Sequence, residues 1–297
     1  KLIYWAGGNP FHHHQDLNRL VKAWQKPNTI IVNEIWWNSQ ARHADIVFPA
    51  NTTLERNDIM LNPKDPTIVA NHKAMKSFGE SKTDYEIFSG LSSKLGFKEL
   101  FTENRNEMDW IKFIWEESSN ICEEYRIKLP EFSDFWNKGF YKVPTTENKK
   151  VLLKEFYQNP ITNPLNTPSG KIEITSKTIS SFNLSDCPSH PQWLEPYEWL
   201  GKIDKYPLHL ISNQPSHRLH SQLDNAISSQ NQKIGGREPV LINSKDAEKR
   251  GIKSEDIVVL TNDRGSVLAG AEITNDVMSG VVVLSTGAWF DPDRKSV

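Results

Sequence analysis

The stretch that decides the fold is LIYWAGGNPFHHHQDLNRL, residues 2–20. An apolar run is followed by a glycine turn, and apolar residues then recur at helical spacing over 17–24, behind the helix-capping residue Asp16. Two β-branched runs follow, at 29–32 and 45–48, and the second is closed by a proline. This alternation of strands and helices predicts an α/β fold of the βαβ type.

The middle of the chain contains further helix signals. The pattern TDYE at 83–86 is typical of a capping box, so a helix is expected to begin there and to stop at Gly96. Another amphipathic helix is expected around 108–115. Residues 171–175 alternate apolar and polar side chains after a turn, as a half-buried strand does. Residues 195–201, close to several prolines, indicate a linker between domains.

From residue 207 onward, short β-branched runs are separated by turn residues, which predicts a compact β-barrel. Residues 262–265 are expected to form a hairpin turn and 244–251 a short capped helix. We therefore predict an α/β region with its linker over 1–203 and a truncated C-terminal β-barrel domain over 204–297. The expected strands cover 207–212, 239–243, 256–261, 266–274 and 280–285.

The composition is that of an ordinary globular protein, with 24% charged residues, 37% hydrophobic residues and a formal net charge of -2. This balance indicates no nucleic-acid partner, and no apolar run approaches the roughly 18 residues needed for membrane insertion. Cys122 and Cys187 are too few for a disulfide framework or a four-thiolate metal site. Because the chain starts at Lys1 inside a strand-like run, we interpret it as a fragment.

The strand-turn-helix unit at 2–20 exposes backbone N–H groups at which a phosphate or another polar ligand can dock. By itself this unit also fits a nucleotide-binding module without redox chemistry. The triplet His12, His13 and His14 raises a zinc hydrolase as another alternative. Zinc sites favour an i, i+4 spacing, whereas three consecutive histidines on a helix point in three directions. A hydrogen-bonding or packing role therefore fits the triplet better than metal binding.

Longer motifs are more specific. GGNPFHHHQDLNRL at 7–20 and WWNSQARHADIVFPANTTLERNDI at 36–59 resemble sulfoxide and N-oxide reductases, and five more segments continue this match in the same order. The chain is thus similar to molybdopterin oxidoreductases of the dimethyl sulfoxide reductase family, in the group of trimethylamine N-oxide and biotin sulfoxide reductases. The five segments are TPSGKIEI (167–174), SNQPSHRLHSQLD (212–224), GREPVLIN (236–243), NDRG with LAGA (262–271) and GAWFDP (287–292).

The resemblance implies a fold, a cofactor and a reaction. The fold is part of a dinucleotide-binding-like α/β domain followed by a C-terminal β-barrel of the double-psi type. The cofactor is molybdopterin guanine dinucleotide, two copies of which hold molybdenum in the intact enzyme. The reaction is reduction of an S-oxide or N-oxide, namely biotin sulfoxide, methionine sulfoxide or trimethylamine N-oxide, by oxygen-atom transfer. A c-type cytochrome or a thioredoxin-like protein is the expected electron donor.

The resemblance also indicates what this chain lacks. In these reductases a serine from an N-terminal segment binds the molybdenum, and no segment here matches it, so we expect no metal ligand. The cofactor-binding stretch that normally follows GAWFDP is not matched either. The chain alone is therefore expected to be inactive. The compartment stays open between the periplasm and the cytoplasm of a bacterium.

By resemblance, Asn9 and His13 fall where the family contacts the dinucleotide. Asn33 and Glu34 close the next strand, where ribose hydroxyls are expected. Arg56 carries the forked guanidinium that suits a phosphate.

Asp84 has a carboxylate able to accept from the guanine N1–H and amino group, although a plain helix-start charge is the alternative. A second set of contacts is implied in a polar loop of the C-terminal region, because a pterin edge presents alternating donors and acceptors. An ordinary polar surface loop is the alternative there. The two segments are expected to converge on one cofactor, so that Asp84 and Arg218 face one crevice. The second set is Ser212, Asn213, Gln214, Pro215, Arg218, His220, Ser221 and Gln222.

Trp36, Trp37 and Arg42 follow the second predicted strand and are expected to line the approach of the substrate. An aromatic wall with one cation suits small polarised S=O or N–O groups. The alternative for these tryptophans is packing in the core. Trp37 and Arg42 are the two candidates for the reaction site.

Overall fold

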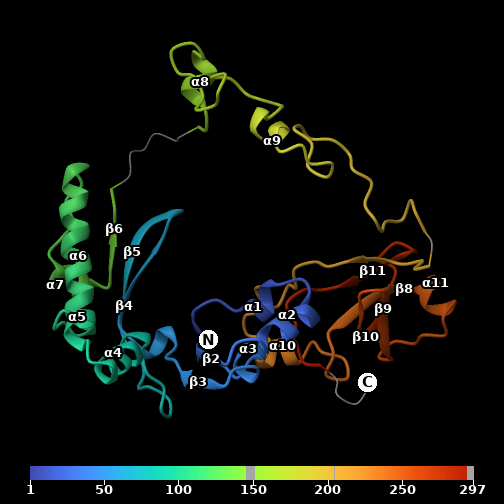
Figure 1. The fold of residues 1–297 in the computed structure, drawn as a ribbon, viewed down its shortest axis with the longest axis horizontal. Coiled ribbons are helices and arrows are strands. Elements are labelled where there is room, and N and C mark those ends of the chain that lie inside the picture. Colours follow the sequence, from blue (N-terminus) through green and yellow to red (C-terminus); the bar gives the residue numbers. More distant parts are fainter. Residues whose placement is uncertain (145–150, 204, 293–297) are drawn as a thin grey trace. The chain divides into compact units, whose positions relative to one another are not determined.

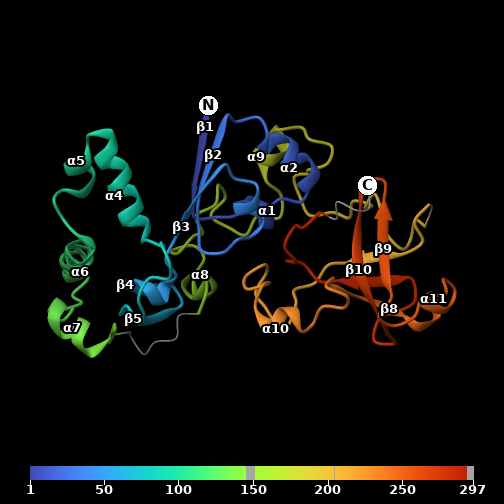
Figure 2. The same ribbon diagram turned by 90° about the horizontal axis from the view of Figure 1, so that it is seen from below.

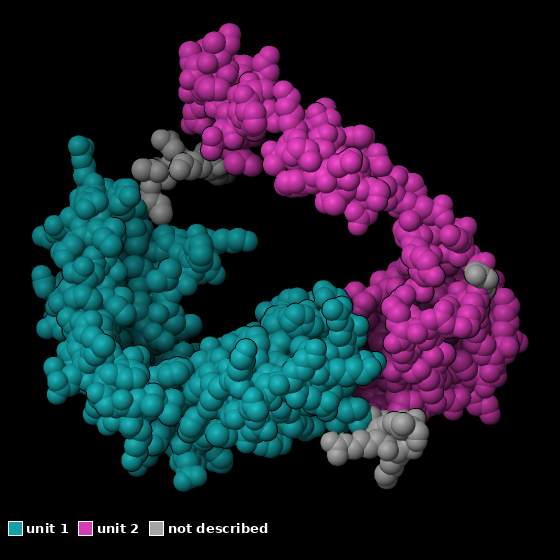
Figure 3. All heavy atoms as spheres, in the orientation of Figure 1, with its two compact units in different colours: residues 1–145, 214–232, 285–297 teal, residues 146–213, 233–284 magenta. Residues whose placement is uncertain are grey.

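The computed structural model describes residues 1–144, 151–203 and 205–292. The chain forms two compact units, each built from separate stretches of sequence and coloured separately in Figure 3. The domain boundary expected near residue 203 stays a prediction. Unit 1 contains residues 1–145, 214–232 and 285–297, and unit 2 contains residues 146–213 and 233–284.

Unit 1 begins with three parallel strands in the order β1-β2-β3 (Figure 2), namely β1 (Leu2–Ala6), β2 (Thr29–Glu34) and β3 (Ile46–Pro49). The helices α1 (Pro10–His13) and α2 (Leu17–Trp24) connect β1 to β2, which confirms the predicted βαβ arrangement. Parallel strands bring their carboxyl ends to one edge of the sheet. The turn after β1 therefore lies at the edge where β2 ends.

The apolar core beside this sheet is formed by Phe11, Trp24, Ile30 and Val32, none of which is more than 8% exposed. Phe290, from the last stretch of the same unit, packs against this cluster with its ring centroid 6.1 Å from that of Phe11. The core of unit 1 is thus completed by residues from the far end of the sequence.

The rest of unit 1 is an antiparallel sheet of order β4-β5-β6 and several helices. The predicted capping box is confirmed at α4, where Thr83 and Glu86 bond each other's backbone N–H and the helix ends at Gly96 with φ 81°. The helix expected around 108–115 is confirmed as α6. The elements are α3 (Ser39–Arg42), η1 (Thr53–Glu55), β4 (Asp58–Asn62), β5 (Asp65–Asn71), α4 (Asp84–Leu95), α5 (Lys98–Thr102), α6 (Glu107–Glu124), α7 (Phe132–Lys138), β6 (Phe140–Lys142) and α10 (Ile227–Gln230).

Unit 2 contains a mixed five-stranded sheet of order β7-β11-β8-β10-β9, of which β8 to β11 are labelled in Figure 1. All five predicted strands are confirmed, as is the hairpin between β9 and β10. Val240, Ile242 and Val282 are buried in its core beside three alanines. The elements are β7 (His209–Ile211), β8 (Pro239–Asn243), α11 (Ser244–Glu248), β9 (Ile257–Asn262), β10 (Gly265–Thr274) and β11 (Val281–Leu284).

The prediction of a strand over 171–175 is wrong. These residues form no strand, and Ile172 and Ile174 are 69% and 77% exposed. An alternating pattern becomes a strand only where a neighbouring strand supplies hydrogen bonds and a face to cover. Here the backbone N–H of Ser169 is instead bonded by Glu173, and the carbonyl of Lys171 by the Thr167 hydroxyl. The nearby helices are short, α8 (Lys154–Gln158) and α9 (Lys177–Ser181), and bury no residue.

Membrane-spanning helices are not found in the described stretches of the chain, because none of their helices is both long and apolar enough to cross a bilayer. The longest of these helices, α6, has 18 residues and includes Glu116, Glu117 and Glu123.

The core of unit 2 gives a stability prediction. Val240 on β8 is 0% exposed, whereas Val259 on the same sheet is 60% exposed. We expect Val240→Ala to lower the free energy of unfolding by about 2 kcal/mol, because it removes buried methyl groups and leaves a cavity. Val259→Ala, the matched control, should change it by less than about 0.5 kcal/mol. Urea titration followed by far-ultraviolet circular dichroism measures both, and equal effects would contradict the assignment of the core.

Candidate functional site

The turn after β1 places a polar group at the edge of the parallel sheet. Gly7 and Gly8 have φ values of 82° and 74°, which glycine adopts without steric cost. The turn brings Asn9 to the N-cap of α1, where its Oδ1 accepts from the N–H of Phe11 at 3.1 Å. The Nδ2 of Asn9 is buried and has no hydrogen-bond partner among the described residues. A buried donor without a protein partner is costly, which makes Asn9 a candidate for bonding a ligand atom.

The histidines that follow differ in their surroundings. His13 is exposed, whereas His12 is half-buried and its ring stacks on Trp289, with centroids 6.0 Å apart and planes 18° apart. The Nε2 of His12 is buried and lacks a partner within the described part of the chain. Burial, then the charge of His13, lowers the pKa of His12 to about 4, although Asp224 acts in the opposite direction. The His12 ring is therefore neutral at pH 7.

A second polar group lies where β1 and β2 meet. The hydroxyl of Tyr4 donates to Asn33 Oδ1 at 2.9 Å, and Asn33 Nδ2 donates to Asp84 Oδ1 at 2.7 Å. Burial, then the charge of Asp84, raises the pKa of Tyr4 above its ordinary value. Asp84 is the first residue of α4, and its side chain is exposed. Glu34, beside Asn33, accepts from the N–H of Ile35 at 3.0 Å.

Arg56 follows a loop that is fastened by the buried Glu55. The carboxylate of Glu55 accepts from the N–H of Thr52 at 2.7 Å and from other loop groups, and these bonds hold its pKa below the ordinary value. Arg56 donates from Nε to Asp58 at 3.2 Å and from one terminal nitrogen to the carbonyl of Asn51 at 3.4 Å. A guanidinium has five N–H donors, so these two bonds leave donors for an anion.

Arg218 has a side chain that the protein encloses almost completely. Its side chain is 1% exposed and lies 3.6 Å from the carboxylate of Asp224, which is 4% exposed. The guanidinium also donates to the carbonyls of His220 at 3.1 Å and Thr286 at 3.0 Å, and contacts His217 Nε2 at 2.7 Å. This ion pair therefore joins the 214–232 stretch to the 285–292 stretch of unit 1.

Trp289 is held by the same loop. Its backbone N–H donates to Asp224 at 3.2 Å and its indole N–H donates to the carbonyl of Ser221 at 2.8 Å. The close approach needs a glycine two residues earlier, because a Cβ on Gly287 would lie 2.1 Å from the carbonyl oxygen of His220. The φ of Gly287, 91°, is also one that other residues rarely adopt.

The other predicted residues are spread over both units. Ser212 and Asn213 belong to unit 2, where the Ser212 hydroxyl donates to the carbonyl of Leu284 at 3.1 Å. Trp37 is 63% exposed, and Arg42 pairs with Asp291 at 3.4 Å. The remaining predicted residues of unit 1 divide into the buried Pro215 and Ser221 and the exposed Gln214, His220 and Gln222.

Two polar groups thus form in unit 1, one around Asn9 and one around Asn33. Asp84 is bonded by Asn33, whereas Arg218 donates to the carbonyls of His220 and Thr286, so the convergence of the two residues on one crevice stays a prediction. The sequence interpretation missed the roles of Tyr4, Asp224 and Trp289, and assigned His12 only to packing or hydrogen bonding. The motif GAWFDP contained Trp289, but nothing in the sequence indicated which side chain its ring faces. Within the described ranges, no three His, Cys, Asp or Glu side chains are grouped so that they could hold a metal ion.

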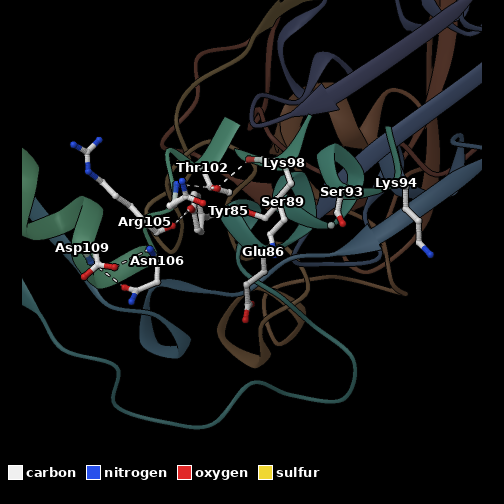
Figure 4. Close-up of a pocket in the computed structure, with 12 residues that line it drawn as sticks. Tyr85, Glu86, Ser89, Ser93, Lys94, Lys98, Thr102, Arg105, Asn106 and Asp109 are labelled. Atoms are coloured by element: carbon white, nitrogen blue, oxygen red, sulfur yellow. Dashed lines mark hydrogen bonds between the residues drawn. The ribbon is translucent and has the colours of Figure 1, made fainter. Parts of the chain in front are cut away.

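A pocket of about 670 Å³ lies elsewhere in unit 1, between α4, α5 and the start of α6 (Figure 4). Glu86 and Asp109 in its lining are occupied as helix caps, and the Tyr85 hydroxyl donates to the carbonyl of Arg105. Lys94 stands apart from the central group of side chains in this view. None of the predicted cofactor or substrate residues is part of this lining.

Comparison with known proteins gives this arrangement a family. Residues 1–94 match the family model described as "Molybdopterin oxidoreductase", and residues 208–296 match the one described as "Molydopterin dinucleotide binding domain". The chain is also 45% identical over 296 residues to a dimethyl sulfoxide/trimethylamine N-oxide reductase of Cereibacter sphaeroides. This chain belongs to the molybdopterin oxidoreductase family. The family resemblance expected from the motifs is confirmed.

Other members of the molybdopterin oxidoreductase family match equally widely. A biotin sulfoxide reductase of Cereibacter sphaeroides is 45% identical over 293 residues, and a trimethylamine-N-oxide reductase of Haemophilus influenzae is 43% identical over 305 residues. Each match covers 98% of this chain but only 36% to 39% of the relative. The chain therefore spans little over a third of the length of these relatives. The fold resembles that of acetylene hydratase from Pelobacter acetylenicus, with a TM-score of 0.72, 16% identity and coverage of 97% and 37% of the two chains.

The buried ion pair yields a prediction with an internal control. We expect Arg218→Ala to destabilise unit 1 by about 3 kcal/mol, because it leaves the buried Asp224 carboxylate without its cation. The ion pair of Arg42 with Asp291 has side chains 46% and 71% exposed, so Arg42→Ala should cost less than about 1 kcal/mol. Chemical denaturation followed by tryptophan fluorescence measures both. Equal losses of unfolding free energy in the two variants would show that the buried ion pair stabilises unit 1 no more than the exposed one.

The depressed pKa of His12 predicts a pH dependence of stability. The unfolded chain binds a proton at His12 below about pH 6.5, whereas the folded chain resists protonation until about pH 4. Stability should therefore fall as the pH drops through this window, by about 2 kcal/mol, which allows for water reaching part of the ring. His12→Phe should remove this part of the slope. A variant with the same slope as the wild type between pH 7 and pH 4.5 would contradict the burial of His12.

Proposed function

We propose that this chain holds molybdopterin guanine dinucleotide as part of a molybdenum-dependent reductase of S-oxides or N-oxides. Its family membership and its similarity to three reductases support this proposal. The observation that carries it is the buried Nδ2 of Asn9, which has no partner among the described residues and lies at the carboxyl edge of the parallel sheet. The pyrophosphate, ribose and heterocycles of a dinucleotide all offer acceptors for such a donor.

Residues of the first stretch are proposed to hold the nucleotide part. Arg56 keeps unused N–H donors and binds a phosphate. Asp84 has an exposed carboxylate and accepts from the guanine N1–H and amino group. The other proposed contacts of this stretch are Asn9, His13, Asn33 and Glu34.

Residues of the loop after β7 are proposed to meet the pterin part, because most of their hydrogen-bonding groups are uncharged and suit its alternating edge. The mixed parallel and antiparallel pairing of the five-stranded sheet supports a barrel of the double-psi type in unit 2. The proposed contacts of this loop are Ser212, Asn213, Gln214, Pro215, Arg218, His220, Ser221 and Gln222.

The bound cofactor supplies oxygen-atom transfer, and the residues of the chain bind it, orient it and shield it from water. Trp37 and Arg42 are proposed to line the approach of the oxide, with Arg42 held by Asp291. Trimethylamine N-oxide, biotin sulfoxide and methionine sulfoxide are the proposed substrates. A c-type cytochrome or a thioredoxin-like protein is the proposed electron donor.

Co-purification tests the cofactor. When the whole protein that contains this chain is produced in a bacterium that makes molybdopterin guanine dinucleotide, we expect pterin to stay bound, measured from the fluorescence of its oxidised form. Asn9→Ala should weaken retention about tenfold, since it removes one buried hydrogen bond. Asn18→Ala, on the exposed face of α2, is the control and should retain pterin normally. A wild-type chain that binds guanosine diphosphate but never pterin would instead indicate a nucleotide-binding module.

The substrate role of Trp37 is tested in the active enzyme that contains this chain. Trp37→Ala should change the ratio of kcat/KM for trimethylamine N-oxide and biotin sulfoxide by about fivefold, a difference of about 1 kcal/mol in transition-state binding. Trp193, which is 72% exposed in unit 2, provides the control Trp193→Ala. Unchanged kinetics for both substrates would remove Trp37 from the substrate site.

A further inference from the structure

His12 is a polar side chain that the proposed function leaves unused. Its Nε2 is buried and has no partner among the described residues, as is also true of Nδ2 of Asn9, three residues earlier. Both residues belong to the same short segment, with Asn9 capping α1 and His12 within it. Two such atoms in one turn are more than packing explains, because buried polar groups are nearly always paired.

The orientation of His12 is fixed by Trp289, whose ring stacks on the imidazole. The indole is itself fixed at two points, since its backbone N–H and ring N–H are bonded to Asp224 and Ser221. A tryptophan whose backbone N–H and indole N–H are both hydrogen-bonded has little rotational freedom left. The face of His12 that meets Trp289 is therefore closed to a ligand, which leaves its edge with Nε2.

The buried pair of Arg218 and Asp224 holds Trp289 in turn. Arg218 contacts Asp224, two backbone carbonyls and His217, which are groups of the protein itself. One of these carbonyls belongs to Thr286, three residues before Trp289. With its side chain 1% exposed, Arg218 is placed to organise the loop.

We propose that His12 is an additional, uncharged hydrogen-bonding contact for a heterocyclic edge of the bound dinucleotide, and that Arg218, Asp224 and Trp289 position it. This inference rests on the proposed function. The open edge of the His12 ring carries a nitrogen without a partner among the described residues, and burial keeps this ring neutral at pH 7, so the contact suits an uncharged ligand group. A neutral imidazole offers one donor and one acceptor, which suits a pterin or guanine edge, whereas a phosphate calls for a cation.

Two substitutions separate the hydrogen bond from the packing. His12→Phe keeps a flat ring against Trp289 but has no nitrogen, and His12→Gln keeps an amide nitrogen near the place of Nε2 but has no ring. We expect His12→Phe to lower pterin retention about tenfold and His12→Gln to stay within about threefold of the wild type. His14→Phe, at an exposed position, is the control and should retain pterin normally.

The positioning residues are tested by the titration of His12, followed by nuclear magnetic resonance of the chain with labelled histidines. Trp289→Ala should raise the pKa of His12 from about 4 toward the ordinary value, because the ring becomes solvated. Asp224→Asn should lower it further, because it removes the charge that favours the protonated ring. A general loss of stability does not produce opposite shifts in two variants.

The outcomes distinguish this inference from the proposed function. If the wild-type protein that contains this chain retains no pterin, the proposed function fails, and this inference fails with it. If the wild type retains pterin and His12→Phe retains it equally well while folded, only the role of His12 is overturned. If His12→Phe loses pterin and neither Trp289→Ala nor Asp224→Asn moves the His12 pKa, the positioning part is overturned.

Discussion

The buried ion pair between Arg218 and Asp224 is the interaction on which unit 1 depends. Taking two charges out of water is unfavourable, so a pair like this persists only where further hydrogen bonds complete its geometry. Those bonds run to the backbone of His220, Thr286 and Trp289. This one ion pair therefore holds the 214–232 and 285–292 stretches together. The stacking of Trp289 on His12 of α1 depends on that arrangement.

Local signals along the chain were enough to predict much of the fold. Asp16 and Thr83 each cap a helix because a side-chain oxygen meets a free N–H only a few residues away. The runs that form β8 to β11 were recognisable from their β-branched residues. Their partner strands in the sheet are equally apolar. Where neighbours in the sequence decide the structure, its pattern is readable.

The candidate site was harder to predict, because its contacts join distant parts of the chain. The pattern at 171–175 has the period of a strand but no partner strand within the described part of unit 2, so period alone misled. Asn9 and Asp84 were recognisable only through the family motifs. The stacking of His12 on Trp289 and the enclosure of Arg218 depend on tertiary packing, and neither residue type nor spacing indicates them.

The discontinuity of unit 1 has a consequence for biosynthesis. The hydroxyl of Ser39 donates to the carbonyl of Phe290 across 251 positions, and Phe290 closes the core around Phe11. A chain that emerges from the ribosome with its amino end first cannot complete this contact until residue 290, 251 positions after Ser39, has been synthesised. The nascent βαβ segment thus stays open during elongation, which delays its maturation and prolongs its need for protection against aggregation.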